Sequence, residues 1–171
     1  MHRFHYKGKE LYAEQVAVRK VAQAVGTPFY LYSISTFLDH YNKLKEAFKP
    51  LNPLICFSTK ANSNMTVLKA LVNQGSGLDI VSGGELERAK KVGVDPQKIV
   101  YASVGKSEAE IEEAIRSKIL MFNVESVQEL DAINQVASRL KTRQKIAIRI
   151  NPDVQPHTHK YITTGSKENK F

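Results

Sequence analysis

The sequence predicts an α/β fold built as a partial TIM-type (β/α) barrel, in which parallel strands alternate with covering helices. Two observations indicate this fold: short, continuously apolar runs recur along the chain, and segments with helical periodicity separate them. Such runs are typical of parallel strands that helices cover, and we expect both faces of these strands to be buried. The competing architecture is a doubly wound nucleotide-binding sheet, but residues 60–62, where its glycine-rich turn would fall, contain no glycine. The barrel is therefore favoured.

Apolar runs define the expected strands, and capping signals define the expected helices. The strands are expected at residues 28–32, 54–57, 78–81, 99–102, 119–124 and 146–150. Ser107 and Ser126 each precede a glutamate by three residues, the spacing of a helix capping box. The apolar faces of the two helices that follow are Ile111, Ala114 and Ile115, then Leu130, Ile133 and Val136. Glycines are expected to end helices at Gly26, Gly75 and Gly93.

The N-terminal residues differ in pattern from the rest of the chain. Residues 2–6 and 10–12 predict a short hairpin around Gly8, with a helix starting at Val16. We therefore divide the chain into residues 1–27, a β-hairpin and helix from a second, β-rich unit, and residues 28–171, an incomplete barrel. A complete barrel of this kind needs about 250 residues. Because the apolar repeats stop at residue 150 of 171, we expect a fragment with exposed sheet edges.

Composition excludes several function classes. The net charge of +8 comes from scattered Lys and Arg residues without a basic stripe, so no nucleic-acid partner is expected. The positive balance favours small anionic ligands instead. No apolar run is long enough to span a bilayer, residues 1–6 do not resemble a signal peptide, and Cys56 is the only cysteine. We expect a cytoplasmic protein with no membrane contact.

Polar residues at the carboxyl ends of the apolar runs form the candidate site, because barrels of this class carry their chemistry there. Lys60 follows the run at 54–57, where an amine can form a Schiff base with a carbonyl. Asp79 and Arg149 lie inside apolar strands, and a buried charge needs a partner. We expect these two to pair beside Lys60. The alternatives are a lysine that only leads the strand into solvent and an ion pair that only fixes strand register.

Two further motifs are weaker. The segment Ser82-Gly83-Gly84-Glu85 would let a loop approach a ligand closely, although Glu85 would also favour a helix N-terminus without any ligand. His157 and His159 lack a second ligand cluster, so no metal site is expected. No Ser/His/Asp triad or Walker-type phosphate loop is visible.

Several segments together resemble the diaminopimelate decarboxylase family, pyridoxal-phosphate enzymes of fold type III with an alanine racemase-like barrel. They are residues 57–62, 79–86, 122–126, 149–154, 158–165 and 167–171, in the family's order. The Lys-Ala-Asn piece at 60–62 alone fits several decarboxylases. Its combination with Arg-Ile-Asn-Pro-Asp-Val at 149–154 and the Thr-His-x-Tyr-Ile segment from 158 is much more specific. Thr59 replaces the valine or phenylalanine often found before the lysine, which we treat as neutral.

The resemblance implies a cofactor, a reaction and a set of site residues. Lys60 would hold pyridoxal 5'-phosphate covalently, and Ser58, Asp79 and Arg149 would line the cofactor. Asn62 and Glu85 are further possible contacts. The reaction would convert the amino acid meso-2,6-diaminopimelate into L-lysine and carbon dioxide, the last step of lysine biosynthesis.

The resemblance also implies what this chain lacks. In the family, Lys60 would stand on the first barrel strand, Asp79 on the second and Arg149 on the fifth, which leaves three strands missing. The glycine-rich phosphate loop, the partners of the pyridine ring and the C-terminal β-domain that completes a homodimer would also be absent. We therefore expect this portion alone to be inactive. The alternatives are an ornithine, arginine or carboxynorspermidine decarboxylase of the same fold type, or a non-catalytic remnant.

Overall fold

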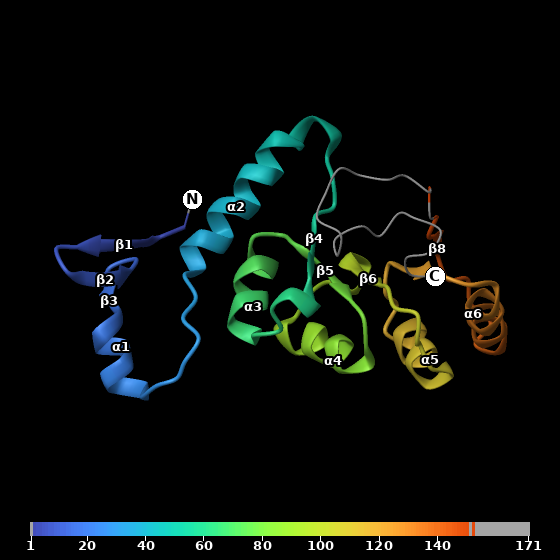
Figure 1. The fold of residues 1–171 in the computed structure, drawn as a ribbon. Coiled ribbons are helices and arrows are strands. Elements are labelled where there is room, and N and C mark those ends of the chain that lie inside the picture. Colours follow the sequence, from blue (N-terminus) through green and yellow to red (C-terminus); the bar gives the residue numbers. More distant parts are fainter. Residues whose placement is uncertain (1, 151, 153–171) are drawn as a thin grey trace.

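The computed structural model describes residues 2–150 and 152, which form a small antiparallel sheet and a larger parallel sheet (Figure 1). The small sheet has the order β1 (Phe4–Lys7), β2 (Glu10–Ala13), β3 (Val16–Ala17). Gly8 lies in the β1–β2 turn at φ 62°, a conformation that costs glycine little. The predicted hairpin is present. The helix expected from Val16 begins two residues later, as α1 (Val18–Val25), because Val16 and Ala17 pair with β2.

The predicted strand at residues 28–32 is wrong. This segment contains no helix or strand and leads instead into α2 (Ile34–Ala47), which Ser33 caps by accepting a hydrogen bond from the Thr36 amide. Pro28 has no N–H to donate to a sheet. Tyr30 is 89% exposed, and its ring stacks on that of Tyr32, with 6.5 Å between the ring centroids. The apolar character of this run therefore reflects exposed aromatic rings and not a buried strand.

The larger sheet carries the predicted barrel strands in chain order. Its five parallel strands are β4 (Cys56–Ser58), β5 (Gly77–Ile80), β6 (Ile99–Tyr101), β7 (Met121–Val124) and β8 (Ile146–Ile148). The helices between them are α3 (Met65–Asn73), α4 (Gly83–Val92), α5 (Glu108–Arg116) and α6 (Val127–Arg139). Short 3-10 turns occupy Lys49–Leu51, Thr59–Ala61 and Pro96–Lys98. This β/α alternation, with every strand paired to the next, is that of a partial (β/α) barrel.

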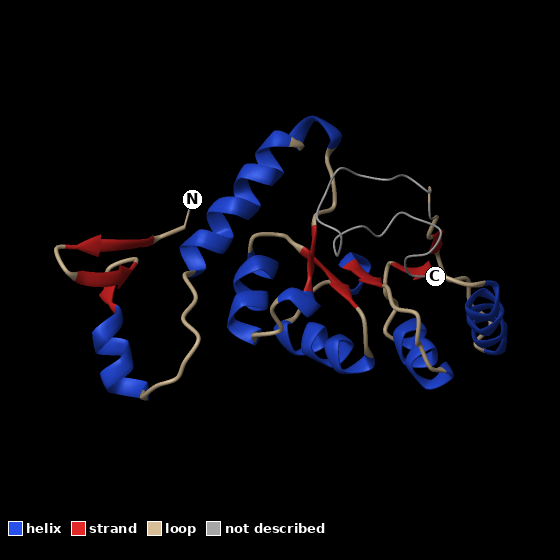
Figure 2. Ribbon diagram, in the orientation of Figure 1, coloured by secondary structure: helices blue, strands red, loops and turns tan. Residues whose placement is uncertain are grey.

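The hydrophobic core lies between the sheet and helices α3 to α6, which cover one of its faces (Figure 2). The predicted faces of α5 and α6 point into it, since Ile111, Ala114 and Ile133 are buried. Gly26 and Gly93 follow α1 and α4 with positive φ, and Gly75 follows α3 in the same way, as predicted. The expectation that both faces of the strands are buried is wrong for the described residues, because the face opposite the helices is only partly covered.

The small sheet contacts the start of α2 through charged side chains. Arg3 forms an ion pair with Asp39 at 2.5 Å. Glu14 accepts hydrogen bonds from the Ser33 hydroxyl at 2.7 Å and the Ser35 amide at 3.0 Å, and these contacts lower the pKa of the Glu14 carboxyl. The division at residue 27 stays a prediction. Among the described residues, no helix has both the length and the apolar composition that crossing a bilayer requires.

Candidate active site

Three of the predicted site residues share the face of the sheet that the helices leave uncovered. Side chains alternate along a strand, so Phe57 and Leu78, which are paired in register, face the helices, whereas Ser58 and Asp79 face the other way. Val124 and Ile148 are paired on the helix side, and Arg149 follows Ile148. The Arg149 amide donates to the Val124 carbonyl at 2.9 Å, which continues the ladder.

Lys60 lies directly beyond the carboxyl end of β4. It is the central residue of the turn Thr59–Ala61, and its side chain is exposed. Thr59 anchors this turn through burial, because its side chain is completely buried. Its hydroxyl has no hydrogen-bond partner among the described residues, which is a cost to the fold. The turn therefore presents the Lys60 amine at the end of the sheet where Ser58 and Asp79 also lie.

Ser58 and Asp79 are joined across neighbouring strands. The Ser58 hydroxyl donates to Asp79 Oδ2 at 3.1 Å, which orients the carboxylate on the uncovered face. The predicted Asp79–Arg149 pair is wrong: Arg149 instead forms an ion pair with Glu125, with 3.7 Å between Nη1 and Oε1. The physical reason is the strand order, because β6 and β7 separate β5 from β8, and Glu125 follows β7, the neighbour of β8.

The two further predicted contacts, Asn62 and Glu85, hold local backbone groups. Asn62 Oδ1 accepts from the Asn64 amide at 3.0 Å. Glu85 accepts from the Val81 amide at 2.8 Å, and its own amide donates to Ser82 Oγ at 3.2 Å, which closes the N-terminus of α4. Both residues therefore shape the loops after β4 and β5, and their role as ligand contacts stays a prediction.

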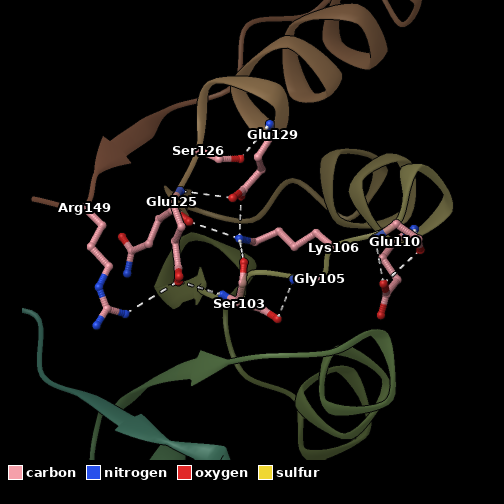
Figure 3. Close-up of polar contacts among 10 residues, drawn as sticks. Ser103, Gly105, Lys106, Glu110, Glu125, Ser126, Glu129 and Arg149 are labelled. Carbon is pink, nitrogen blue, oxygen red and sulfur yellow. Dashed lines mark hydrogen bonds and ion pairs between the residues drawn. The ribbon is translucent and has the colours of Figure 1, made fainter. Parts of the chain in front are cut away.

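Lys106 and Glu125 complete the polar end of the sheet, and neither was predicted from the sequence. In Figure 3, Lys106 reaches toward Glu129, and Glu125 lies between Ser103 and Arg149. The Lys106 side chain is fully buried and that of Glu125 is 3% exposed. The sequence held one signal for these two residues. Lys106 directly precedes the N-cap Ser107, and Glu125 directly precedes the N-cap Ser126, so both lie in the short loops that follow barrel strands.

Cys56 lies beside this site, and its surroundings favour the protonated thiol. Burial, together with the nearby Asp79 carboxylate, raises the pKa of the Cys56 thiol to about 11. A thiol with such a pKa is almost entirely protonated at neutral pH, and the thiolate is the reactive form. The role of Lys60 as the reactive amine stays a prediction.

No metal centre is visible in the part of the chain that the structure describes, where no three His, Cys, Asp or Glu side chains cluster as metal ligands would. His157 and His159, which had been weighed as metal ligands, lie outside the described residues, as do Asn151 and all but one of the residues after it. The structure therefore does not test most of the motif at residues 149–154, or any of the segment at residues 158–165.

A family model described as "Pyridoxal-dependent decarboxylase, pyridoxal binding domain" matches residues 34–171 of the chain. The chain belongs to this decarboxylase family. Among curated relatives, the diaminopimelate decarboxylase of Aquifex aeolicus is 49% identical over 97% of the chain, and that of Haemophilus influenzae is 48% identical over all of it. These alignments cover 39% and 41% of the relatives, so the chain spans about 40% of their length.

Solved structures of diaminopimelate decarboxylases have the same fold as the part of this chain that they match. Diaminopimelate decarboxylase from Helicobacter pylori, complexed with L-lysine, superposes with a TM-score of 0.86 at 47% identity, over 90% of this chain and 39% of that one. The diaminopimelate decarboxylase from M. jannaschii, in co-complex with L-lysine, superposes with a TM-score of 0.89 at 37% identity. The match covers 98% of this chain and 40% of that one. A lysine decarboxylase from Selenomonas ruminantium, at 21% identity and a TM-score of 0.76, shows the shared fold alone.

The residues of this family member fit a pyridoxal phosphate. An exposed amine at the carboxyl end of β4 suits attachment of an aldehyde, and an arginine at the end of β8 suits an anion. Asp79, oriented by Ser58, adds a carboxylate on the same face. The amine, hydroxyl, carboxylate and guanidinium groups of these residues are thus complementary to the carbonyl, hydroxyl and charged groups of that cofactor.

Proposed function

We propose that this chain forms the cofactor-binding part of a decarboxylase that converts meso-2,6-diaminopimelate into L-lysine and carbon dioxide. The observation that carries the proposal is the exposed Lys60 beyond β4, on the sheet whose uncovered face bears Ser58 and Asp79, in a chain about 48% identical to diaminopimelate decarboxylases. The ornithine, arginine and carboxynorspermidine alternatives are less favoured, because the curated relatives that match at 44% to 50% identity are named diaminopimelate decarboxylases.

Each site residue has a role in this proposal. Lys60 supplies the amine that anchors pyridoxal phosphate, which, when bound, provides an electron sink for the electron pair left by the departing carboxylate. Asp79 places a negative charge at the uncovered face, and Ser58 fixes its orientation through the 3.1 Å hydrogen bond. Arg149 holds a positive charge at the other end of the strand series and binds an anionic group. Asn62 and Glu85 shape the neighbouring loops.

Selective attachment of the cofactor tests this proposal in the 171-residue chain. The chain is mixed with less than one equivalent of pyridoxal phosphate, its absorbance is recorded, and borohydride reduction fixes the bound cofactor for peptide mapping by mass spectrometry. We expect labelling concentrated on Lys60 and lost in Lys60→Ala. The matched control is Lys141→Ala, another exposed lysine, which should leave the labelling of Lys60 unchanged. Equal labelling of all exposed lysines would contradict the proposal.

The decarboxylation itself, the homodimer and the cytoplasmic location belong to the same proposal. They are supported by the resemblance to diaminopimelate decarboxylases, of which this chain spans about 40%. For an enzyme of this family that contains these residues, Lys60→Ala should abolish release of carbon dioxide from meso-2,6-diaminopimelate. Sedimentation velocity measures the dimer, and a purely monomeric complete enzyme would contradict that part.

A further inference from the structure

A buried lysine connects two strand ends beside the proposed site. The Lys106 ammonium donates to the carbonyl of Ser103 at 2.8 Å, to that of Asn123 at 3.0 Å and to Glu129 Oε1 at 2.6 Å. Its side chain has no exposure, so all three donors must be used inside the protein. Lys106 therefore ties the loop after β6 to the end of β7, and its charge is offset by Glu129.

Glu129 uses its second oxygen to fix the start of the next loop. Oε2 accepts from the Glu125 amide at 3.0 Å, while the Glu129 amide donates to Ser126 Oγ at 3.1 Å (Figure 3). In a regular capping box the glutamate would return to the amide of the N-cap residue itself. Here it reaches one residue further back and also neutralises Lys106. The backbone of Glu125 is thus held by the same carboxylate that holds the buried lysine.

The side chain of Glu125 points from this fixed backbone toward Arg149. Its Oε1 accepts from the Ser103 amide at 3.2 Å and lies 3.7 Å from Nη1 of Arg149. The other oxygen, Oε2, is buried and has no hydrogen-bond partner among the described residues. Ser103 has φ 139°, a strained conformation for a residue with a side chain. That strain is tolerated where the Lys106 and Glu125 contacts hold the residue on both sides.

We propose that Glu125 is a positioning residue for Arg149, and that the Lys106–Glu129 pair keeps Glu125 in place. The inference rests on the proposed function in one respect, because a fixed Arg149 matters for binding only if the site takes an anionic cofactor. The Arg149 side chain is 39% exposed, and holding a partly exposed guanidinium in one orientation costs conformational entropy. The buried Glu125 carboxylate holds it at the uncovered end of the sheet before any ligand binds, which reduces the entropy lost on binding.

Side-chain NMR of the 171-residue chain, labelled with ¹⁵N-arginine, tests the pairing without any cofactor. The Nε–H signal of Arg149 is assigned by its loss in Arg149→Lys. We expect an order parameter above the value of about 0.6 that marks a flexible group, and a clear fall of that parameter in Glu125→Gln. Glu125→Asp, which keeps the charge on a shorter side chain, should give an intermediate value and serves as the second variant if Glu125→Gln does not fold.

The matched control is Glu108→Gln, which removes the exposed ion pair between Glu108 and Arg139 at 2.6 Å. It should change the Arg139 signal and leave that of Arg149 unaltered. An Arg149 order parameter that stays the same in both Glu125 variants, or that falls equally in the control, overturns the inference. Cofactor labelling at Lys60 is scored separately. If that labelling fails while Glu125→Gln still loosens Arg149, the proposed function is wrong and the positioning role stands.

Discussion

At the scale of single residues, Gly77 is the glycine, among those described, where an added Cβ atom would meet its neighbours most closely. A Cβ atom there would lie 2.4 Å from the Lys98 carbonyl oxygen and 2.7 Å from Cys56 Sγ, so the backbone of a neighbouring loop would have to move. We expect Gly77→Ala to lower the free energy of unfolding by about 2 to 3 kcal/mol, measured by urea denaturation. Gly84→Ala is the control, because its Cβ would meet nothing closer than 3.9 Å in a helix. It should be neutral or stabilise by about 0.5 to 1 kcal/mol, and equal losses in both variants would refute this account.

Lys106 allows a second residue-scale prediction, about stability alone. Lys106→Met removes three hydrogen bonds and leaves the Glu129 carboxylate, which is 9% exposed, without its counter-charge. We expect a loss of about 3 to 5 kcal/mol in the free energy of unfolding, partly recovered in the double variant with Glu129→Gln. Lys90→Met is the matched control, since Lys90 pairs with Glu87 and Glu113 at the surface, and it should lose less than about 1 kcal/mol.

Residue types and their place in or after apolar strands were enough to select Lys60, Asp79 and Arg149 as candidates, and the family resemblance added Ser58. Neither gave the partner of Arg149. A charge inside an apolar strand predicts that a partner exists, whereas the identity of that partner depends on which strands are neighbours. Glu125 is adjacent because β7 pairs with β8. Lys106 was missed for another reason: in a polar loop sequence, a buried lysine with all three donors satisfied looks the same as a solvated one.

At the scale of elements, the capping box of α5 couples two helices and gives the fold a pH dependence. Glu110 accepts from the Ser107 amide at 3.0 Å and, from the neighbouring helix α4, the Gly83 amide at 2.7 Å. These hydrogen bonds lower the pKa of the Glu110 carboxyl from its ordinary 4.5 to about 2. Because the folded-state pKa is depressed, this stabilisation is fully present above about pH 4.5 and is lost as the pH falls toward 2.

Glu110→Gln measures that contribution. Urea denaturation at neutral pH should show the variant to be about 1 to 2 kcal/mol less stable than the unmodified chain, an amount that allows for solvent screening. The gap should close as the pH approaches 2, where the unmodified chain has lost its carboxylate. Asp131→Asn, an exposed change on α6, should show no such gap at either pH. If the difference in unfolding free energy between Glu110→Gln and the unmodified chain stays the same down to pH 2, the charge of the carboxylate is not its source.

Elements with a local cause were predictable, and elements set by distant partners were not. Ser107 and Ser126 cap α5 and α6, and Gly26 and Gly93 follow α1 and α4, so these helix limits followed from the sequence. The helix α2, which Ser33 caps, was not predicted. Whether an apolar run becomes a strand depends on a neighbour to pair with. Residues 28–32 have no strand to pair with and stay irregular. Val16 and Ala17 pair with β2 as a short strand, so they do not join the helix that the sequence predicted from Val16.

At the scale of the whole molecule, the parallel sheet has two edges, since β4 and β8 each pair with one strand in the described part of the chain. An apolar groove of about 510 Å³ lies between α2 and β4, and its lining includes Ser58 and Ala61, so it borders the candidate site. At the other edge, Ile146 and Ile148 are exposed on the side that continues the core. Exposed apolar edge strands are templates for pairing with further chains. We therefore expect the 171-residue chain to self-associate as its concentration rises.

Ile148→Lys tests whether this edge causes the association. Ile148 is 69% exposed, so a lysine there should cost little folding stability. It would place a charge on the exposed apolar face of the edge strand β8. Light scattering at matched concentrations should show less association than for the unmodified chain. Val25→Lys makes the same chemical change at a residue that is 66% exposed at the end of α1, away from the sheet edge. If the edge of β8 causes association, only Ile148→Lys should reduce scattering. An equal reduction in both variants would show that added positive charge, and not the edge of β8, governs association.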